Sequence, residues 1–168
     1  MMVIVLMLMF IGINTSYAVR YSDIEDHWAK EYIIPLAERN IISGYPDETF
    51  RPNDNITVAE FTKLVLVSLK VKITDSNPWY ESIIDRAMEY GLIKLGEFDN
   101  YDKRFITRGE MARIITRQLG IDSPKVETTS FIDDNEIPEN LKGYIKVAAD
   151  KKIITGLPNG SFNPKGNA

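Results

Sequence analysis

The sequence repeats itself, and this internal repetition restricts the fold more than any other feature. Related motifs recur in the same order at regular spacing: Thr57 and Thr107 lie 50 residues apart, and Gly44 and Gly156 lie 112 apart, or two steps of 56. A unit of this size exposes an apolar face that it cannot bury alone, so neighbouring units must pack together. The predicted units, in chain order, are residues 19–70, 71–120 and 121–168.

The first unit carries the fullest set of motifs. It opens with an aromatic residue two positions before an aspartate, continues through a His-Trp-Ala triplet and a glycine-containing turn, and closes on a Thr-x-x-Glu sequence. In chain order these are Tyr21-Ser22-Asp23, His27-Trp28-Ala29, Gly44-Tyr45-Pro46-Asp47, Phe50-Arg51-Pro52 and Thr57-Val58-Ala59-Glu60. The second unit keeps Trp79, Gly91-Leu92-Ile93 and Phe105-Ile106-Thr107-Arg108-Gly109-Glu110, and the third keeps Phe131-Ile132-Asp133, Gly156-Leu157-Pro158-Asn159-Gly160 and Phe162-Asn163-Pro164.

Each unit is predicted to form a helix, a loop and a second helix, so the predicted fold class is all-α. Apolar residues recur at helical spacing on either side of loops that contain turn-forming residues. The predicted apolar faces of the three first helices are Ala29, Ile33, Leu36 and Ala37, then Tyr80, Ile83, Ile84, Ala87 and Met88, then Leu141, Ile145, Ala148 and Ala149. Those of the second helices are Phe61, Leu64 and Val65, then Met111, Ile114, Ile115 and Leu119.

The third unit is predicted to lack its second helix. Asn167-Ala168 aligns with Asn55-Ile56, which stands directly before the second helix of the first unit. We therefore expect a truncated third repeat. The other second helices would then carry apolar surface that this repeat does not cover.

The first 18 residues predict a secretory signal peptide. Residues 1–13 are uncharged and almost wholly apolar, and Ser16-Tyr17-Ala18 places small residues at the two positions that a signal peptidase reads. The apolar run is shorter than the roughly 20 residues of a membrane span, so no stable span is expected after cleavage. No Lys or Arg precedes the run, and an uncleaved N-terminal anchor is the alternative. Both predict a protein outside the cell.

The composition excludes several classes of site. A net charge of −4 offers no basic face, so no nucleic-acid partner is expected. The absence of cysteine excludes disulfides, zinc–thiolate sites and cysteine nucleophiles. His27, the single histidine, has no partner at catalytic or metal-binding spacing and is predicted to be structural. No metal or cofactor is expected, because Asn53-Asp54-Asn55 lacks the glycine and the terminal glutamate of a calcium loop.

These motifs resemble the S-layer homology family from Tyr21 to the end of the chain. The family pattern is an aromatic-x-Asp opening, a His-Trp-Ala triplet, a Gly-Tyr-Pro-Asp-Gly-x-Phe-x-Pro loop and an Ile-Thr-Arg-Ala-Glu start of the second helix. The resemblance implies three repeats in a pseudo-threefold arrangement. The second helices would form a central bundle, with ligand grooves between the lobes.

The same resemblance implies a non-enzymatic module that anchors proteins non-covalently to secondary cell-wall polysaccharide bearing a pyruvylated sugar. The implied location is secreted, at the bacterial cell wall or S-layer, with other surface-layer proteins as further partners. The alternative is a structural or protein-interaction module that does not bind sugar. An enzyme such as a glycosidase is disfavoured, because no paired carboxylates or nucleophile–base pair emerge from the sequence.

Arg108 is the main candidate for a ligand contact. Thr107 and Glu110 are predicted to form a capping box, which does not need an arginine, and the helix dipole disfavours a cation there. We therefore predict an anion site made by Arg108 beside free amides of the helix start. The resemblance assigns this arginine to a pyruvate carboxylate, which a guanidinium grips through two parallel hydrogen bonds. The alternative is an exposed arginine paired with Asp102 or another surface carboxylate. Val58 occupies the equivalent position of the first unit.

Two tryptophans and two aspartates are further candidates. Trp28 and Trp79 are predicted mainly as packing residues at helix starts, with stacking on a sugar ring as the alternative. Asp23 and Asp133 are predicted to accept hydrogen bonds from loop amides or hydroxyls, with sugar hydroxyls as a secondary option.

The glycine-containing turns complete the candidate site. Gly44 and Gly156 are predicted to provide either a positive φ or a close backbone approach after the first helix. The resemblance places the residues that follow them, Tyr45 and Leu157, at the border of a groove.

Overall fold

The structure, a computed structural model, describes residues 20–122 and 124–168 and divides the chain into two compact units, residues 1–50 and 51–168. In the described ranges the regular elements are five α-helices and one 3-10 helix, without a β-strand, so the predicted all-α class is confirmed. The signal peptide predicted at residues 1–18 lies outside the described residues. None of the described helices is long and apolar enough to cross a membrane.

The first unit contains α1 (Lys30–Glu38). This helix begins where Nδ1 of His27 accepts a hydrogen bond from the backbone amide of Ala29 at 3.2 Å. That bond satisfies one of the amides that a helix start leaves without an intrahelical partner. The structural role predicted for His27 is therefore confirmed.

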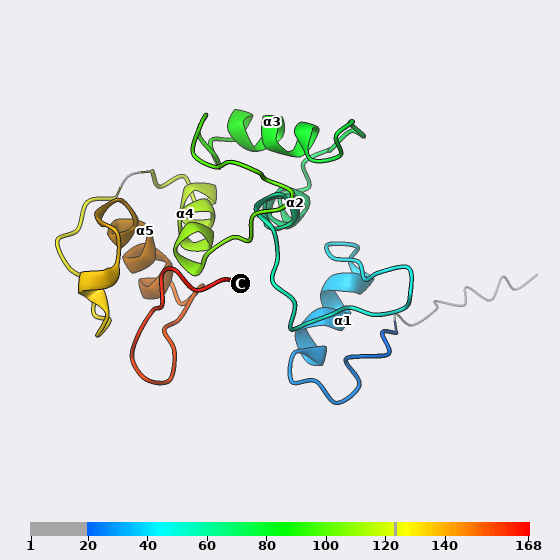
Figure 1. The fold of residues 1–168 in the computed structure, drawn as a ribbon, viewed down its shortest axis with the longest axis horizontal. Helices are drawn as coiled ribbons and strands as arrows, with labels where there is room; N and C mark the ends of the chain where they lie inside the picture. Colours follow the sequence, from blue (N-terminus) through cyan, green and yellow to red (C-terminus); the bar gives the residue numbers. More distant parts are fainter. Residues whose placement is uncertain (1–19, 123) are drawn as a thin grey trace, which may run out of the picture. The chain divides into compact units, whose positions relative to one another are not determined.

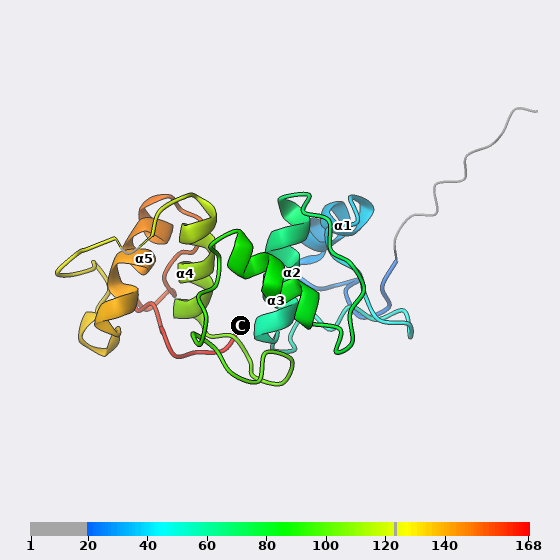
Figure 2. The same ribbon diagram turned by 90° about the horizontal axis from the view of Figure 1, so that it is seen from above.

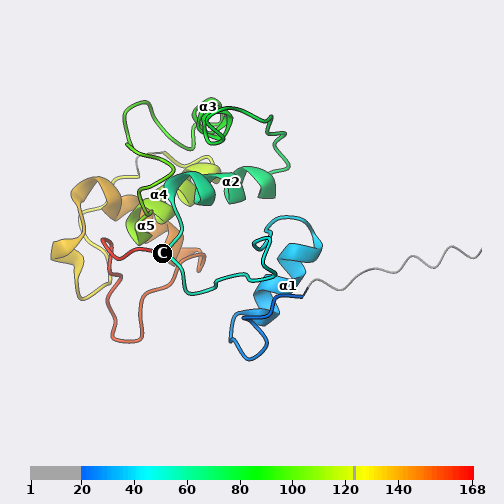
Figure 3. The same ribbon diagram turned by 45° about the vertical axis from the view of Figure 1, so that its right-hand side comes forward.

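The second unit contains α2 (Val58–Ser68), α3 (Glu81–Glu89), α4 (Arg108–Gln118), the 3-10 helix η1 (Asp134–Glu136) and α5 (Glu139–Asp150). Figures 1 and 2 show α4 and α5 side by side, and this is the most extensive helix–helix contact. Figure 3 shows α3 end-on above α2, so the two helices, which are in contact, cross each other.

Two apolar clusters fill the second unit, and both include residues of α4. The smaller cluster joins α4 to α5 and the loop after it, and its buried members are Ala112, Ile137, Leu141, Tyr144, Ile145, Ala148 and Phe162. The larger cluster joins α2, α3, the loop after α3 and α4. Its buried members are Val58, Phe61, Val65, Leu66, Val71, Ile83, Ile84, Ala87, Leu92, Ile93, Phe98, Ile106 and Ile114.

The helices α2 and α4 begin with the same capping geometry. Thr57 Oγ1 accepts from the amide of Glu60 at 3.3 Å, and the Glu60 carboxylate accepts from the amide of Thr57 at 2.8 Å. Thr107 and Glu110 repeat this pair of bonds at 3.4 and 3.0 Å. Both predicted capping boxes are confirmed, and each satisfies two backbone amides at a helix start.

A closed ring of three backbone hydrogen bonds joins corresponding positions of the three predicted repeats. The amide of Ile56 donates to the carbonyl of Ala168 at 2.7 Å, Ala168 donates to Ile106 at 3.1 Å, and Ile106 donates to Ile56 at 3.0 Å. Ile56 and Ile106 each directly precede a capping threonine, and Ala168 aligns with them. Such a ring is the backbone contact expected at a pseudo-threefold axis.

Candidate functional site

The Arg108 site forms where the start of α4 meets the loop after α5. Nε of Arg108 donates to the carbonyl oxygen of Phe162 at 2.9 Å, and Nη2 donates to that of Thr155 at 2.8 Å. The guanidinium carbon lies over the Phe162 ring, 5.0 Å from its centroid, in cation–π geometry. These three contacts fix the position and the plane of the guanidinium.

The Arg108 guanidinium keeps donors available for a ligand. It is half-buried, and two of its five N–H groups are used in the bonds to the loop carbonyls. Within the described residues no carboxylate lies within ion-pair distance of it, so the pairing with Asp102 considered as an alternative is wrong. The remaining three N–H groups form a donor set of the kind that binds a carboxylate.

The Arg108 guanidinium is partly desolvated and lies within the influence of the Asp133 carboxylate. Burial lowers the pKa of the Arg108 guanidinium from its usual value, and the negative charge of Asp133 partly offsets that effect. The group still stays protonated at neutral pH, because an arginine pKa lies far above that range. A cation that has lost hydration without gaining a carboxylate partner is stabilised by any anion that reaches it.

The predicted contribution of free helix amides to this site is wrong. The amide of Arg108 donates to the carbonyl of Gly166 at 2.9 Å, and that of Gly109 donates to Pro164 at 3.0 Å. The amide of Glu110 is held by the capping threonine. The incoming loop has therefore already satisfied the donors that an anion would need. At this helix start the guanidinium of Arg108, and not the backbone amides of residues 108 to 110, keeps N–H donors that are not used among the described residues.

Asp133 organises the loop that holds Arg108. Its two carboxylate oxygens accept from the amides of Phe162 and Asn163, each at 2.8 Å. In the first unit, Asp23 accepts from the amide of Phe50 at 2.8 Å. The prediction that these aspartates receive loop amides is confirmed, and Asp133 thereby helps to position the carbonyl to which Arg108 donates.

Glycine is needed at positions 44 and 156 because an aromatic ring lies close to the backbone there, and not because φ is positive. A Cβ atom at Gly156 would lie 2.6 Å from Cε1 of Phe131, and one at Gly44 would lie 2.3 Å from Cε1 of Tyr21. Neither glycine has a positive φ. The aromatic ring two residues before each aspartate therefore packs directly on the glycine backbone, which explains why the two motifs occur together.

Tyr45 and Leu157 occupy matching places in their loops. Tyr45 donates its amide to Thr49 at 2.8 Å, and Leu157 donates its amide to Ser161 at 2.7 Å. Both side chains are exposed. Leu157 lies two residues after Thr155 and is part of the loop that contacts Arg108, whereas Tyr45 belongs to the first unit.

Thr107 and Glu110 face each other across the helix start. Besides the capping bonds, the Glu110 carboxylate pairs with Arg104 at 2.6 Å. Burial raises the pKa of Glu110, but the hydrogen bonds from Arg104 and Thr107 outweigh it and leave that pKa lowered. These side chains hold the first turn of α4 in place and so determine where Arg108 points.

The packing role predicted for the tryptophans is wrong. Trp28 is 78% exposed and Trp79 is 45% exposed. The reason is that α1 and α3 begin two residues after these tryptophans, which leaves both rings on the loops before the helices. The ring of Trp79 meets that of Tyr80 edge-on, with 6.1 Å between the ring centroids. Trp28 lies in the first unit.

The first residue of α2 is Val58, which corresponds to Arg108 at the start of α4 and carries no charge. Val58 is completely buried in the larger apolar cluster, and its amide donates to the carbonyl of Arg104 at 3.0 Å. The backbone contact thus matches that of Arg108 with Gly166. The difference lies in the side chain, which belongs to the apolar core at Val58 and is a half-buried cation at Arg108.

The sequence did not identify Thr155 and Phe162 as site residues. Phe162 belongs to a recurring Phe-x-Pro motif, which was the available signal, but the ring and carbonyl contacts to Arg108 span 54 residues of chain. Thr155 contributes a backbone carbonyl, and no side-chain pattern marks such a contact.

Comparisons with known proteins place these segments in a family. The sequence profile of the S-layer homology domain matches residues 20–62 and 131–168. The chain is 34% identical over 166 residues, 91% of its length, to an amylopullulanase from Thermoanaerobacterium thermosulfurigenes. It is 34% identical over 164 residues, 90% of its length, to exoglucanase XynX from Acetivibrio thermocellus.

A shorter match has higher identity. Over 57 residues, 34% of the chain, the sequence is 46% identical to a cellulosome-anchoring protein from Acetivibrio thermocellus. The chain spans 9% of the amylopullulanase, 15% of the exoglucanase and 13% of the anchoring protein. It therefore resembles one small part that these differently named proteins share.

Proposed function

The chain belongs to the S-layer homology family, and from this premise we propose that it is a non-enzymatic module that anchors proteins to the bacterial cell wall. The relatives support this proposal. An amylopullulanase, an exoglucanase and a cellulosome-anchoring protein have different names but share this segment. A segment common to such proteins is better explained by a shared location outside the cell than by a shared reaction.

The proposed ligand is a secondary cell-wall polysaccharide that bears a pyruvylated sugar, and Arg108 is the proposed anion contact. The observation that carries this proposal is that Arg108 is fixed by Phe162 and Thr155 while keeping three donors and no carboxylate partner among the described residues. A pyruvate ketal presents one carboxylate, which matches the planar donor fork of a guanidinium. Gly156 and Leu157 would line the sugar beside it.

The remaining candidates receive secondary roles in this proposal. Trp28, Trp79 and Tyr45 expose aromatic rings that can stack on sugar faces. Asp23 and Gly44 shape the loop of the first unit as Asp133 and Gly156 shape that of the third repeat. Thr107 and Glu110 hold the first turn of α4.

The proposal includes three repeats, at residues 19–70, 71–120 and 121–168, preceded by a signal peptide at 1–18. The family profile does not include residues 63–130 in its matched segments. The capping box at Thr107 and the place of Ile106 in the backbone ring support a repeat there as well.

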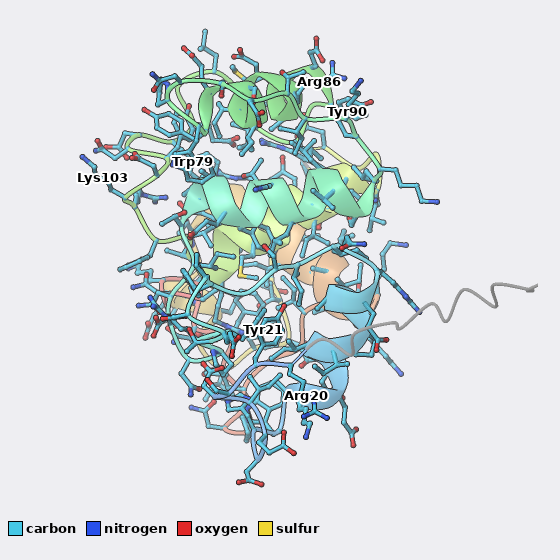
Figure 4. The ribbon with its side chains drawn as sticks, turned by 90° about the vertical axis from the view of Figure 1, so that its right-hand side faces the viewer. Arg20, Tyr21, Trp79, Arg86, Tyr90 and Lys103 are labelled. Atoms are coloured by element: carbon cyan, nitrogen blue, oxygen red, sulfur yellow. The ribbon has the colours of Figure 1, made fainter. Side chains whose placement is uncertain are left out.

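Sedimentation with purified cell walls tests the proposed function. Arg108→Gln keeps a polar side chain of similar length but removes the charge, so we expect the variant to stay in the supernatant while the parent chain pellets. Chemical removal of the pyruvyl groups from the walls should have the same effect on the parent. Arg86→Gln is the matched control, because Arg86 lies on α3 beside Tyr90 and pairs with Glu89 (Figure 4). Unchanged pelleting of Arg108→Gln would contradict the assignment.

A protein-interaction module is the second candidate. The replacement of arginine by Val58 and the exposure of Trp28 and Trp79 favour it. It predicts that a surface-layer protein is retained while walls stripped of protein are not bound. Binding of the parent chain to such stripped walls would exclude it as the main function.

A further inference from the structure

The loop after α5 contains an asparagine followed directly by a glycine. Asn159-Gly160 is the only such pair in the sequence, and both residues are exposed. Asparagine is one of the chemically labile residues. Because glycine has no side chain to shield its amide nitrogen, this nitrogen can approach the side-chain carbonyl carbon of the preceding asparagine. The pair therefore has the composition and the exposure of a site that reacts with itself.

The side-chain oxygen of Asn159 is held by two donors from one residue. Its Oδ1 accepts from the backbone amide of Ser161 at 3.0 Å and from Oγ of Ser161 at 2.8 Å. When the nitrogen of Gly160 adds to Cγ of Asn159, the carbonyl double bond opens and Oδ1 takes up negative charge. Donors at these distances stabilise such a charge in the same way as an oxyanion hole. The bonds that order this loop thus favour the addition.

One hydrogen bond opposes the reaction. The amide of Gly160 donates to the carbonyl of Leu157 at 2.9 Å and closes a turn over the two residues between them. This amide must lose its proton before its nitrogen attacks, and a donated hydrogen bond disfavours that loss. The turn lies in an exposed loop, where local opening costs little free energy. The bonds between Asn159 and Ser161 lie within three residues and do not require the turn to be closed.

The first unit shows that the same turn accepts a carboxylate. There Oδ1 of Asp47 accepts from the amide of Thr49 at 3.2 Å and from its Oγ1 at 2.6 Å. The residue after the aspartate, Glu48, has a φ of 63°, in the left-handed region that Gly160 occupies at 86°. Asp47 therefore corresponds to Asn159 in the third repeat. An aspartate at position 159 would keep both hydrogen bonds from the residue two positions later.

We propose that Asn159-Gly160 is a site of spontaneous deamidation. The nitrogen of Gly160 gives its proton to hydroxide and bonds to Cγ of Asn159, and the side-chain nitrogen takes up a proton and leaves as ammonia. The product is a succinimide ring. One water molecule then opens the ring. Cleavage of the new Cγ–N bond gives aspartate, and cleavage of the original backbone C–N bond gives isoaspartate.

The two products differ in their effect on the loop. Aspartate leaves the backbone and the turn as they are, which is the arrangement seen at Asp47. Isoaspartate takes the main chain through the former side chain and lengthens it by one carbon. The extra carbon displaces Phe162 relative to Asp133, whose carboxylate accepts from the Phe162 amide at 2.8 Å. The isoaspartate form should therefore be the less stable product.

Mass spectrometry tests this site on the whole chain, aged in mildly alkaline buffer and then cut with trypsin, with an unaged sample as the baseline. The tryptic peptide of residues 153–165 contains both Asn159 and Asn163. Asn163 is the internal control, because the following Pro164 has no amide proton to lose. We expect conversion of Asn159 to the acid, faster at higher pH, and none at Asn163. An unchanged Asn159, or equal conversion at the two asparagines, would overturn the proposal.

Three variants test the chemistry of the site. Gly160→Ala places a methyl group beside the attacking nitrogen, in ordinary contact with Ile132 at 3.5 Å, and should slow the conversion many-fold. An unchanged rate would contradict attack by this nitrogen. Ser161→Ala removes one of the two donors to Oδ1 and should slow the conversion severalfold, whereas Ser161→Thr should keep the parent rate. Faster conversion in Ser161→Ala would overturn the role given to Ser161.

Asn159→Asp supplies the aspartate product directly. Its urea midpoint should equal that of the parent chain, because the carboxylate accepts the same two hydrogen bonds. The isoaspartate fraction of the aged chain, separated by chromatography, should unfold at a lower urea concentration. A lower midpoint for Asn159→Asp would contradict its equivalence with Asp47. None of these measurements involves cell walls, so they succeed or fail independently of the proposed function.

Discussion

At the scale of single residues, the position of Arg108 depends on groups that hold the neighbouring loop and form no hydrogen bond with the guanidinium itself. Asp133 anchors the loop through two amides, and Gly156 lets the Phe131 ring reach the backbone. The loop then presents two carbonyls to Arg108. A change at the glycine should therefore act on the arginine without touching it.

Gly156→Ala tests this chain of contacts. The added methyl group would lie 2.6 Å from the Phe131 ring, so we expect destabilisation by about 1 to 3 kcal/mol, which is the range for overpacking. Urea unfolding of Gly156→Ala measures the cost. The double variant with Phe131→Leu should lose less than the sum of the two single changes, because the smaller side chain gives the methyl group room. Strict additivity would show that the ring is not the obstacle.

The individual contacts also show which parts of the site the sequence could predict. The Thr107–Glu110 capping box is encoded within four residues and was predicted correctly. The sequence did not reveal that the amides of Arg108 and Gly109 are occupied. Their partners, Gly166 and Pro164, lie more than 50 residues away and accept through backbone carbonyls, which no side-chain pattern marks. The exposure of Trp28 likewise depended on a helix boundary that shifted by two residues.

At the scale of elements, α4 is the helix on which the Arg108 site depends. It packs against α5, its start carries Arg108, and its middle carries Arg113 and Arg117. Its N-terminal turn is fixed by a capping box and by two hydrogen bonds to the loop after α5. Loosening that turn should affect stability and wall binding together.

Thr107→Ala removes the capping oxygen and is expected to cost about 1 kcal/mol. Thr57→Ala is the matched control on α2, where the same capping box precedes a valine. Both variants should lower the urea midpoint by similar amounts, since both break one cap. Wall binding should weaken with Thr107→Ala but not with Thr57→Ala. Equal weakening by both would show that the loss comes from stability in general.

At the scale of the second unit as a whole, a charged cluster joins segments that are distant in sequence. Glu97 from the loop after α3 pairs with Arg117 of α4, and Asp122 accepts from Tyr144 of α5 at 2.6 Å. The all-α class and the two capping boxes were predictable from helical periodicity and local motifs. This cluster was not, because its members belong to no repeated motif.

The cluster predicts how stability depends on pH. Burial raises the pKa of Glu97, but bonds from Arg117 and the Lys94 amide and the charge of Arg113 outweigh it, so the folded-state pKa is below the usual 4.5. Because the pKa is depressed on folding, this contribution to stability is complete above about 4.5 and is lost as the pH falls through the folded-state value.

Urea unfolding at about pH 7 and about pH 3 measures this dependence. The parent chain should lose stability at the lower pH. Glu97→Gln should cost about 3 kcal/mol at neutral pH, because it removes the only carboxylate that pairs with the buried Arg113 in the described part of the chain and one of the two paired with Arg117, and it should flatten the pH dependence. Glu89→Gln removes the carboxylate of an exposed ion pair with Arg86 and is the control. It should change neither the stability at neutral pH nor the dependence of stability on pH. A parent chain whose stability does not fall on acidification would contradict the role of the cluster.

Calorimetric titration with a pyruvylated sugar glycoside tests the Arg108 assignment most directly. The proposed anchoring predicts measurable heat of binding to the parent chain, none with the same sugar lacking the pyruvyl group, and none with Arg108→Gln. Equal heats for the two sugars, or for the parent and the variant, would contradict it.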